Sequence, residues 1–126
     1  MTFISDIRYV AGVLVGLAIG DAMGAPFEGT PEHPGFTGNF LPGGRMARKS
    51  GSYTDDTLQA LALAESLASC GGYCPEDFMG RLIRDFDLTP FWYGPTSGAV
   101  FQRVRAGVPL HAAARIVHEE RGGGHQ

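Results

Sequence analysis

The hydrophobic positions of the chain repeat with the period of α-helices, and no stretch shows sustained alternation of apolar and polar residues. Apolar side chains recur three and four positions apart, as at Met79, Leu82 and Phe86. The pattern predicts helices over residues 5–22, 55–69, 75–87, 97–107 and 109–122. The predicted fold class is therefore all-α, a compact multi-helix bundle.

Residues at the boundaries of these segments fit the assignment. Ser5 and Ser97 are expected to cap the first and fourth helices, because a serine hydroxyl accepts hydrogen bonds from the free N–H groups at a helix start. Pro75 and Pro109 suit helix starts, where a missing N–H costs nothing. We therefore expect the third helix to begin at Pro75 and the fifth at Pro109.

The first predicted helix carries glycine at every fourth position, at Gly12, Gly16, Gly20 and Gly24. Glycine costs about 1 kcal/mol relative to alanine inside a helix, so this stripe needs a structural reason. Positions four apart share one helix face, and a bare backbone there lets a second helix approach closely. In a membrane the stripe would suggest a dimer face. Because Asp21 lies beside it, we expect the tightly packed central helix of a soluble bundle.

The same region resembles a targeting segment only in part. Residues 9–20 are apolar and close to the N-terminus, but Asp6 stands beside Arg8 where a signal peptide carries a positive cluster. The apolar run is also shorter than the roughly 20 residues that a membrane span needs. We therefore expect neither a signal peptide nor a membrane-bound protein.

Composition and charge narrow the function classes. A chain of 126 residues fits one small domain, and 44% hydrophobic residues suffice for a buried core. The formal net charge of −3 provides no basic footprint for nucleic acid. Cys70 and Cys74 have no partner pair elsewhere for zinc, so we expect reduced structural thiols at a helix end. Without targeting signals, the expected location is the cytoplasm.

A long segment without helical periodicity, residues 26–53, separates the first two predicted helices. Connections of this length are uncommon in compact domains and are usually functional. Arg45, Arg48 and Lys49 lie in it. They form either a solvated loop face or a set of cations that helps to hold an anionic substrate.

Two adjacent carboxylates, Asp55 and Asp56, follow Thr54 directly before the second predicted helix. One interpretation is helix capping by Thr54 or Asp55, with acidic residues placed at the positive end of the helix dipole. The other is a divalent metal site, because hard cations prefer clustered oxygen ligands. Neighbouring helix positions diverge by about 100°, so the two carboxylates suit two neighbouring ions, or one ion plus a bridging water, better than a single ion that both bind face-on.

Three segments, in this order, resemble the ADP-ribosylglycohydrolase family, which includes the dinitrogenase reductase-activating glycohydrolases. They are GLAIGDAMGAPFE at 16–28, GSYTDDTLQAL at 51–61 and FWYGPTSGAVFQRVRAG at 91–107. The resemblance spans nearly the whole chain, and the first two motifs are specific in their order and spacing. It implies a bundle of the ADP-ribosylglycohydrolase type.

The resemblance also implies a binuclear magnesium centre, sometimes occupied by manganese. The Thr-Asp-Asp triplet of the family supplies metal ligands, which correspond here to Thr54, Asp55 and Asp56. Glu28 corresponds to a metal-linked carboxylate that is a candidate base, and Asp21 to a residue that orients the site. The implied catalytic residues are Glu28, Asp55 and Asp56.

The implied reaction is hydrolysis of the glycosidic bond between ADP-ribose and an acceptor. The expected partners are an ADP-ribosylated protein or a small ADP-ribose conjugate. Gly94, Thr96 and Ser97 precede a predicted helix, where free N–H groups suit a phosphate or ribose oxygen; a plain turn is the alternative.

The remaining metal ligands of the family come from a distal Asp-x-Asp-Ser/Thr motif near the C-terminus, which these 126 residues do not contain in that position. We therefore expect residues 1–126 to be the N-terminal part of a single domain, completed by a C-terminal segment. The alternative is a non-catalytic remnant or interaction module of the same fold.

Overall fold

The computed structural model describes residues 7–29 and 35–122. It falls into two compact units, residues 1–61 and residues 62–126, with the boundary inside the second helix. Each unit is described by itself below. The predicted cap at Ser5 lies outside the described residues, and the prediction of a single domain stays a prediction.

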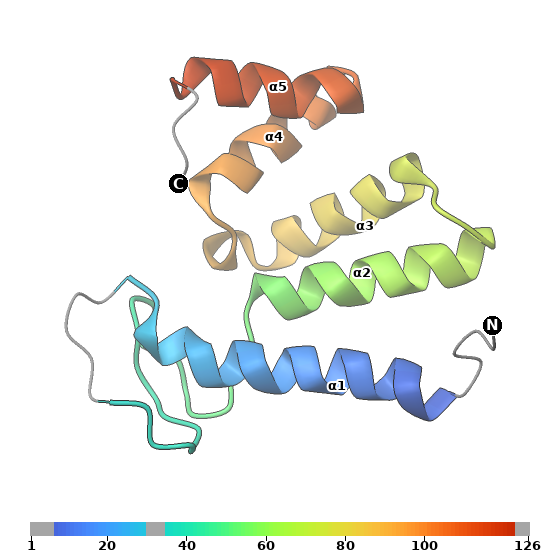
Figure 1. The fold of residues 1–126 in the computed structure, drawn as a ribbon. Coiled ribbons are helices and arrows are strands. Elements are labelled where there is room, and N and C mark those ends of the chain that lie inside the picture. The colour runs from blue at the N-terminus through green and yellow to red at the C-terminus, as the bar shows by residue number, and fades with distance from the viewer. Residues whose placement is uncertain (1–6, 30–34, 123–126) are drawn as a thin grey trace. The chain divides into compact units, whose positions relative to one another are not determined.

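The described residues form helices joined by turns, without a β-strand (Figure 1). An isolated bridge between Gly43 and Arg48 is the one extended pairing recorded in this part of the chain. The prediction of an all-α fold is confirmed. The elements are α1 (Ile7–Gly24), the 3-10 turn η1 (Ala25–Phe27), α2 (Asp55–Cys70), α3 (Pro75–Leu88), the 3-10 turn η2 (Pro90–Trp92), α4 (Pro95–Arg105) and α5 (Leu110–Glu120).

The apolar side chains of α1 are largely exposed, among them Ile7, at 76% of its full area, and Val13, at 69%. A Cβ atom added at any of the four stripe glycines would meet no atom of the described residues within 4 Å, apart from its chain neighbours and the nearby backbone of its own helix. The expectation of a helix packed against this stripe is therefore wrong for the residues described. A helix that is apolar all round is typical of the interior of a larger protein or of a membrane span.

One helical segment, Ile7–Phe27, is long and apolar enough to cross a membrane, judged by length and composition alone. It has 21 residues, and its most apolar 18-residue stretch has a mean hydropathy of 1.7 and is 11% buried within this chain. The expectation that the apolar run is too short to span a bilayer is wrong for this helical segment, because α1 and η1 together extend it beyond residues 9–20. A core helix of a soluble protein passes the same test.

A tight turn between Gly43 and Arg48 packs against η1. Gly43 and Arg48 exchange two backbone hydrogen bonds of 2.9 Å each. At Gly44, φ is +74°, and an added Cβ would lie 2.5 Å from the carbonyl oxygen of Ala25. Only glycine fits this position, because any side chain would collide with the backbone of η1. The contact ties the long connection to the end of α1.

The second unit has an aromatic core. Phe86, Tyr93 and Phe101 pack edge to face in all three pairings, with ring centroids 5.4 to 5.7 Å apart. This geometry sets the positive edge of one ring against the negative face of another. Leu82 of α3 and Ala62 of α2 complete the buried cluster. The predicted apolar stripe of α3 is therefore the face that this core buries.

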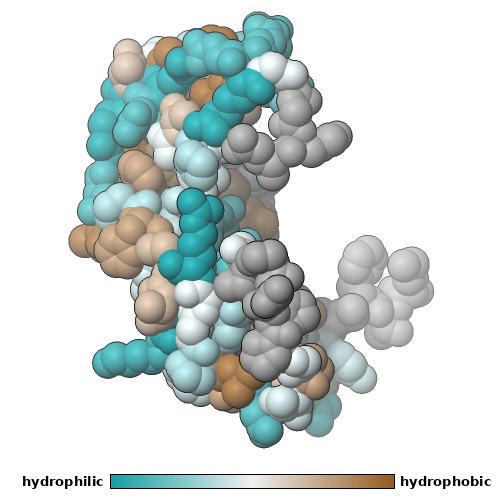
Figure 2. Space-filling model, turned by 90° about the vertical axis from the view of Figure 1, so that its left-hand side faces the viewer, coloured by the Kyte–Doolittle hydropathy of each residue, from teal (hydrophilic) through white to brown (hydrophobic). Residues whose placement is uncertain are grey.

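Hydrophobic side chains also reach the surface beside hydrophilic ones, as the space-filling view shows (Figure 2). In the second unit the exposed large hydrophobic residues include Tyr73, Leu88 and Phe91. Single exposed apolar side chains are ordinary. The exposure of nearly all the apolar side chains along α1 is unusual.

The observed helix starts confirm one prediction and correct two. Pro75 is the first residue of α3, as predicted. Helix α5 begins at Leu110, one residue after the predicted start, and Pro109 is its N-cap. The predicted cap at Ser97 is wrong. Gly94 is the N-cap of α4, because Pro95 starts the helix with its fixed φ and Ser97 falls within the first turn.

Candidate metal and active site

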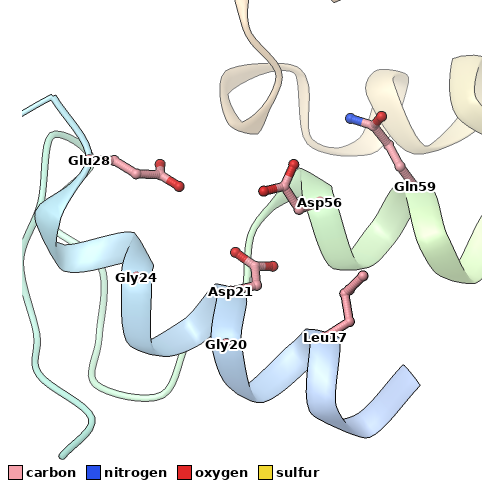
Figure 3. A pocket seen from close by; sticks show the side chains of 7 residues that line it. All are labelled: Leu17, Gly20, Asp21, Gly24, Glu28, Asp56 and Gln59. Atoms are coloured by element: carbon pink, nitrogen blue, oxygen red, sulfur yellow. The ribbon is translucent and has the colours of Figure 1, made fainter. Parts of the chain in front are cut away.

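An open pocket of about 560 Å³ lies in the first unit. Figure 3 shows three carboxylates that converge on it from separate parts of the chain. Asp21 comes from the last turns of α1, Glu28 follows η1, and Asp56 belongs to the first turn of α2. The other lining residues are Leu17, Gly20, Gly24 and Gln59.

Asp21 joins α1 to the start of α2. Its Oδ2 atom accepts hydrogen bonds from the backbone N–H of Thr54 at 2.8 Å and of Thr57 at 3.2 Å. The hydroxyl of Thr54 donates to Oδ1 at 2.7 Å, and that of Thr57 donates to Oδ2 at 2.5 Å. Four donors therefore hold one carboxylate at the N-terminus of a helix, where the helix dipole also favours negative charge.

Thr54 is fully buried, with 0% of its area exposed, and it directly precedes α2. Its Oγ1 accepts a hydrogen bond from the N–H of Asp56 at 3.3 Å, and its carbonyl oxygen accepts one from Leu58. These bonds make Thr54 the N-cap, one of the two residues predicted for that role. Capping is thus observed in the same residues for which metal binding is predicted.

The carboxylates of Asp21, Glu28 and Asp56 each offer an oxygen within 4.8 Å of the other two. Glu28 and Asp56 are exposed, whereas Asp21 is half-buried. Oxygen donors at this spacing fit a hard divalent cation, which binds carboxylates and keeps several waters. The cluster could therefore hold a metal ion.

Asp55 does not belong to that cluster of three. Its Oδ2 atom instead accepts a hydrogen bond from Gln59 Nε2, one helical turn further on, at 3.3 Å. The predicted divergence of the adjacent carboxylates Asp55 and Asp56 agrees with this placement. The roles of Thr54 and Asp55 as metal ligands stay predictions.

The pKa values of the site carboxylates move in opposite directions. Burial would raise the pKa of Asp21, but the hydrogen bonds from Thr54 and Thr57 outweigh it and lower that pKa below its ordinary value. Although Glu28 is exposed, partial desolvation by neighbouring atoms raises its pKa, and the negative charges of Asp21 and Asp56 add to the rise against the opposing charge of Arg48. Burial, followed by repulsion from Asp56, likewise raises the pKa of Asp55. The site therefore concentrates negative charge that a cation would stabilise.

Arg48 is the cation that acts on both Glu28 and Asp55. It is half-buried at the end of the 43–48 turn, and its guanidinium donates to the carbonyl oxygen of Tyr53 at 3.4 Å. The long connection thus brings one of its three predicted cations toward the carboxylates. Whether Arg48 also holds an anionic substrate stays a prediction.

The predicted substrate-binding residues Gly94, Thr96 and Ser97 belong to the second unit. Gly94 and Thr96 are exposed, and Ser97 is half-buried in the first turn of α4. Gly94 accepts a backbone hydrogen bond from Gly98 N–H at 3.1 Å. Free N–H groups remain at this helix start, and the binding role stays a prediction.

Two residues of the site were not predicted from the sequence. Thr57 shares the Asp21 carboxylate with Thr54, and Gln59 holds Asp55. The spacing of Thr54 and Thr57, three positions apart, contained the signal for the first, because such positions share a helix face. The four-residue spacing of Asp55 and Gln59 contained the signal for the second.

Residues 5–125 match the family model described as ADP-ribosylglycohydrolase. The chain belongs to the ADP-ribosylglycohydrolase family. This confirms the resemblance inferred from the sequence motifs, and it places the carboxylate pocket within a family of hydrolases.

Similar proteins support the same assignment. The uncharacterized protein YegU of Escherichia coli (strain K12) is 35% identical, over 80% of this chain and 35% of that protein. The ADP-ribosylarginine hydrolase Tri1 of Serratia proteamaculans (strain 568) is 42% identical, over 58% of this chain and 20% of that protein. A solved structure, an ADP-ribosylglycohydrolase-related protein complex, matches with a TM-score of 0.66 and 37% identity, over 80% of this chain and 34% of its own.

The chain therefore spans about a third or less of the length of these relatives. The matched structure supports the helical fold over the part of the chain that it covers. It does not assign the roles of individual site residues.

Proposed function

We propose that this chain is the N-terminal part of a metal-dependent hydrolase that removes ADP-ribose from ADP-ribosylated substrates. The observation that carries the proposal is the convergence of Asp21, Glu28 and Asp56 on one pocket in a chain of this family. Exposed carboxylates are common at protein surfaces. Three that face one another are costly unless a cation compensates their charge.

The proposed cofactor is Mg²⁺, two ions in the complete site, with Mn²⁺ as a substitute. Glu28 and Asp56 would bind the metal directly, and Asp55 with Thr54 would provide further ligands. Asp21 would orient the start of α2, because its oxygens already accept four hydrogen bonds. The bound metal would hold ribose hydroxyls and stabilise charge that develops as the glycosidic bond breaks.

The chain's own residues would bind the substrate and move a proton. Glu28 is exposed to the pocket and its pKa is raised, so it is suited to accept a proton from the attacking water. Gly94, Thr96 and Ser97 would bind phosphate or ribose oxygens through the N-terminus of α4.

The proposed substrate class is an ADP-ribosylated protein or a small ADP-ribose conjugate. Two relatives are named for such substrates: ADP-ribosylarginine for Tri1, and ADP-ribosyl-[dinitrogen reductase] for a glycohydrolase of Rhodospirillum rubrum. The proposed location is the cytoplasm.

A second candidate function is a non-catalytic interaction module of the same fold. The observation that favours it is the exposed apolar surface of α1. This surface would bind a complementing C-terminal segment, and the resulting assembly would not hydrolyse a substrate.

The test combines the chain with the part of the YegU relative that follows its matched region. We expect release of ADP-ribose from ADP-ribosylarginine in the presence of Mg²⁺. Asp55→Ala and Asp56→Ala should abolish release with little change in helix content by circular dichroism. Asp87→Ala, a carboxylate that pairs with Arg105 in the second unit, is the matched control and should retain activity.

The outcomes separate the two candidate functions. Assembly of the two segments without release would favour the interaction module. Unchanged turnover in the Asp55 or Asp56 variant would remove our assignment of the site.

A further inference from the structure

The second unit contains an open pocket of about 620 Å³ that the proposed reaction does not use. It lies where the turn after α2 meets the first turns of α3 and α5. Pockets that bind small molecules have volumes of roughly 300–1,000 Å³, a mainly apolar lining and a few polar groups. This pocket has that composition, with the side chains of Tyr73, Glu76 and His111 as its polar groups.

Two half-buried side chains of α3, Phe78 and Met79, provide apolar lining. Both pack against the buried core of the second unit, so the contacts that stabilise the fold also fix these two side chains. Leu110, the first residue of α5, adds an apolar side chain from a second helix. A ligand that binds to fixed side chains does not have to order them, which lowers the entropic cost of binding.

An exposed aromatic ring, that of Tyr73, also lines the pocket, and 68% of the area of this residue is exposed. Gly71, with φ +70°, reverses the chain directly after α2 and leads it to Tyr73 just before α3 begins. The face of an aromatic ring attracts a cation, because the π-electrons make the face negative. Tyr73 therefore offers both apolar area and a surface for a positive group.

The charge of the pocket is negative. Glu76 is its one carboxylate, and no lysine or arginine is among its described lining residues. The Glu76 carboxylate contacts the thiol of Cys74, with 3.9 Å between Oε2 and the sulfur, and no ion pair recorded in the described part of the chain includes it. The neighbouring Asp77 is instead paired with Arg81 at 2.7 Å. Glu76 is therefore the carboxylate of this helix start that is available to a bound cation.

We propose that this pocket binds a small organic cation that carries an aromatic ring, such as an arylalkylamine. The ammonium group would pair with Glu76 and face the ring of Tyr73. The aromatic ring of the ligand would pack on Phe78, Met79 and Leu110. The inference is independent of the proposed hydrolase activity, because the carboxylate pocket contains none of these residues.

The two helix starts give the ligand one preferred orientation. The first turn of α3 contains Glu76 and Asp77, which offset the positive end of that helix dipole. The first turn of α5 contains no acidic residue, so its positive end repels a cation. The ammonium group should therefore lie toward α3 and the aromatic ring toward α5.

The experiment titrates the isotopically labelled 126-residue chain with two indoles and follows the backbone amide signals by NMR. Tryptamine carries an ammonium group, and indole-3-propionate carries a carboxylate on a side chain of similar length. We expect tryptamine to bind with a Kd of about a millimolar, which is typical of a ligand of this size, and to shift the amides of residues 73–79 and 110–111. Indole-3-propionate should bind about tenfold more weakly, because Glu76 repels it.

Matched variants test the two groups assigned to the cation. Glu76→Gln should weaken tryptamine binding about fivefold, the upper range for an exposed charge pair. Tyr73→Leu keeps an apolar side chain but removes the aromatic face, and should weaken binding about two- to fivefold. The controls are Glu119→Gln, at an exposed glutamate outside the lining, and Tyr9→Leu, at a tyrosine of the first unit that is 65% exposed. Both controls should bind tryptamine as the unmodified chain does, and circular dichroism should show equal helix content in all four variants.

Three outcomes would overturn the proposal. The first is equal affinity for the two indoles, and the second is a set of shifts centred on the carboxylate pocket of the first unit. The third is the same tryptamine affinity in the two pocket variants and the two controls. An absence of shifts at roughly ten millimolar tryptamine would overturn it as well, because a millimolar Kd implies near saturation there.

Discussion

A single carboxylate, that of Asp21, connects two sequence motifs that lie more than thirty positions apart. It satisfies two N–H groups and two hydroxyls at the start of α2, groups that would otherwise be buried without partners. The same bonds fix the position of the Thr54-Asp55-Asp56 triplet relative to the end of α1. The residue expected to orient the site thus has an observed structural task, and its part in catalysis stays a proposal.

Replacing Asp21 should destabilise the first unit. In Asp21→Ala, four donors lose their acceptor, and leaving buried donors unsatisfied costs about 1–3 kcal/mol for each buried group. We expect a loss of at least about 2 kcal/mol in the free energy of unfolding, measured with urea. Thr57→Val removes one hydroxyl and should cost less. The control is Asp87→Ala, which removes an exposed ion pair and should cost about 0–1 kcal/mol. Equal losses in Asp21→Ala and Asp87→Ala would contradict the role assigned to Asp21.

The opposite pKa shifts predict a stability maximum at acidic pH in the absence of metal. Glu28 binds its proton more tightly in the folded state than its ordinary value of 4.5, so the free energy of unfolding should rise as pH falls through the raised pKa. Asp21 has the opposite effect on the free energy of unfolding, because its pKa is lowered in the folded state. Its contribution is present above the ordinary value of 3.8 and is lost as pH falls through the lowered pKa.

Thermal melts in the presence of a chelator check this prediction. The Tm should increase as pH is lowered from 7 toward about 4.5, and then decrease below about 3.8. Glu28→Gln should reduce the increase, because the titrating group is gone. A Tm that is constant or falls between pH 7 and 5 in the unmodified chain would show that desolvation and repulsion of the Glu28 carboxylate do not govern the stability of the chain.

At the scale of the elements, periodicity located the helices but not every boundary or neighbour. The α3 stripe was predictable because a narrow apolar face can only point to a core, and Leu82 is indeed buried. The cap of α4 was not, because Pro95 competes with Ser97 for the helix start and the fixed φ of proline decides the outcome. The glycine stripe of α1 indicated close packing, but periodicity cannot identify which segment provides it.

The open space around the α1 stripe reverses the expected effect of a substitution there. If a second helix packed on the stripe, a side chain at Gly16 would overpack that contact. A Cβ added at Gly16 instead meets no atom of the described residues within 4 Å, apart from its chain neighbours and the nearby backbone of its own helix. In this chain Gly16→Ala should therefore raise the free energy of unfolding, by up to about 1 kcal/mol from helix propensity.

Gly98→Ala provides the comparison, because its Cβ would lie 3.3 Å from the Phe86 ring. It should stabilise less than Gly16→Ala or destabilise. Urea unfolding of both variants measures the difference. A loss of stability in Gly16→Ala would show that α1 is packed in solution, through self-association or otherwise.

At the scale of the whole molecule, the candidate site was predictable only through the family motifs. Spacing alone left the Thr-Asp-Asp triplet open between capping and metal binding, and the structure shows the capping bonds directly. The convergence of Glu28 with Asp56 depends on the path of the chain between them, which no local pattern contains. Thr57 and Gln59 belong to the site because they lie three and four positions after Thr54 and Asp55 on the same helix. This spacing is visible in the sequence, but neither residue is part of the Thr-Asp-Asp triplet.

The last prediction concerns residues 1–126 by themselves, and it follows from the number of free ligands. Asp21 already accepts four hydrogen bonds, so Glu28 and Asp56 are the two carboxylates of the cluster whose oxygens the described bonds leave most open. Mg²⁺ requires near-octahedral oxygen coordination and dehydrates reluctantly, so an ion held by two exposed carboxylates keeps most of its water. We expect weak Mg²⁺ binding and no hydrolysis of ADP-ribosylated substrates.

Calorimetric titration with Mg²⁺ and an assay for ADP-ribose release measure the two halves of this prediction. Sedimentation in the same buffers measures self-association, which the exposed apolar surface of α1 should promote. Glu28→Gln with Asp56→Asn is the control that should abolish even the weak binding. Tight stoichiometric binding with turnover would show that the carboxylates of this segment suffice, and that ligands from the remaining two thirds of the relatives' length are dispensable.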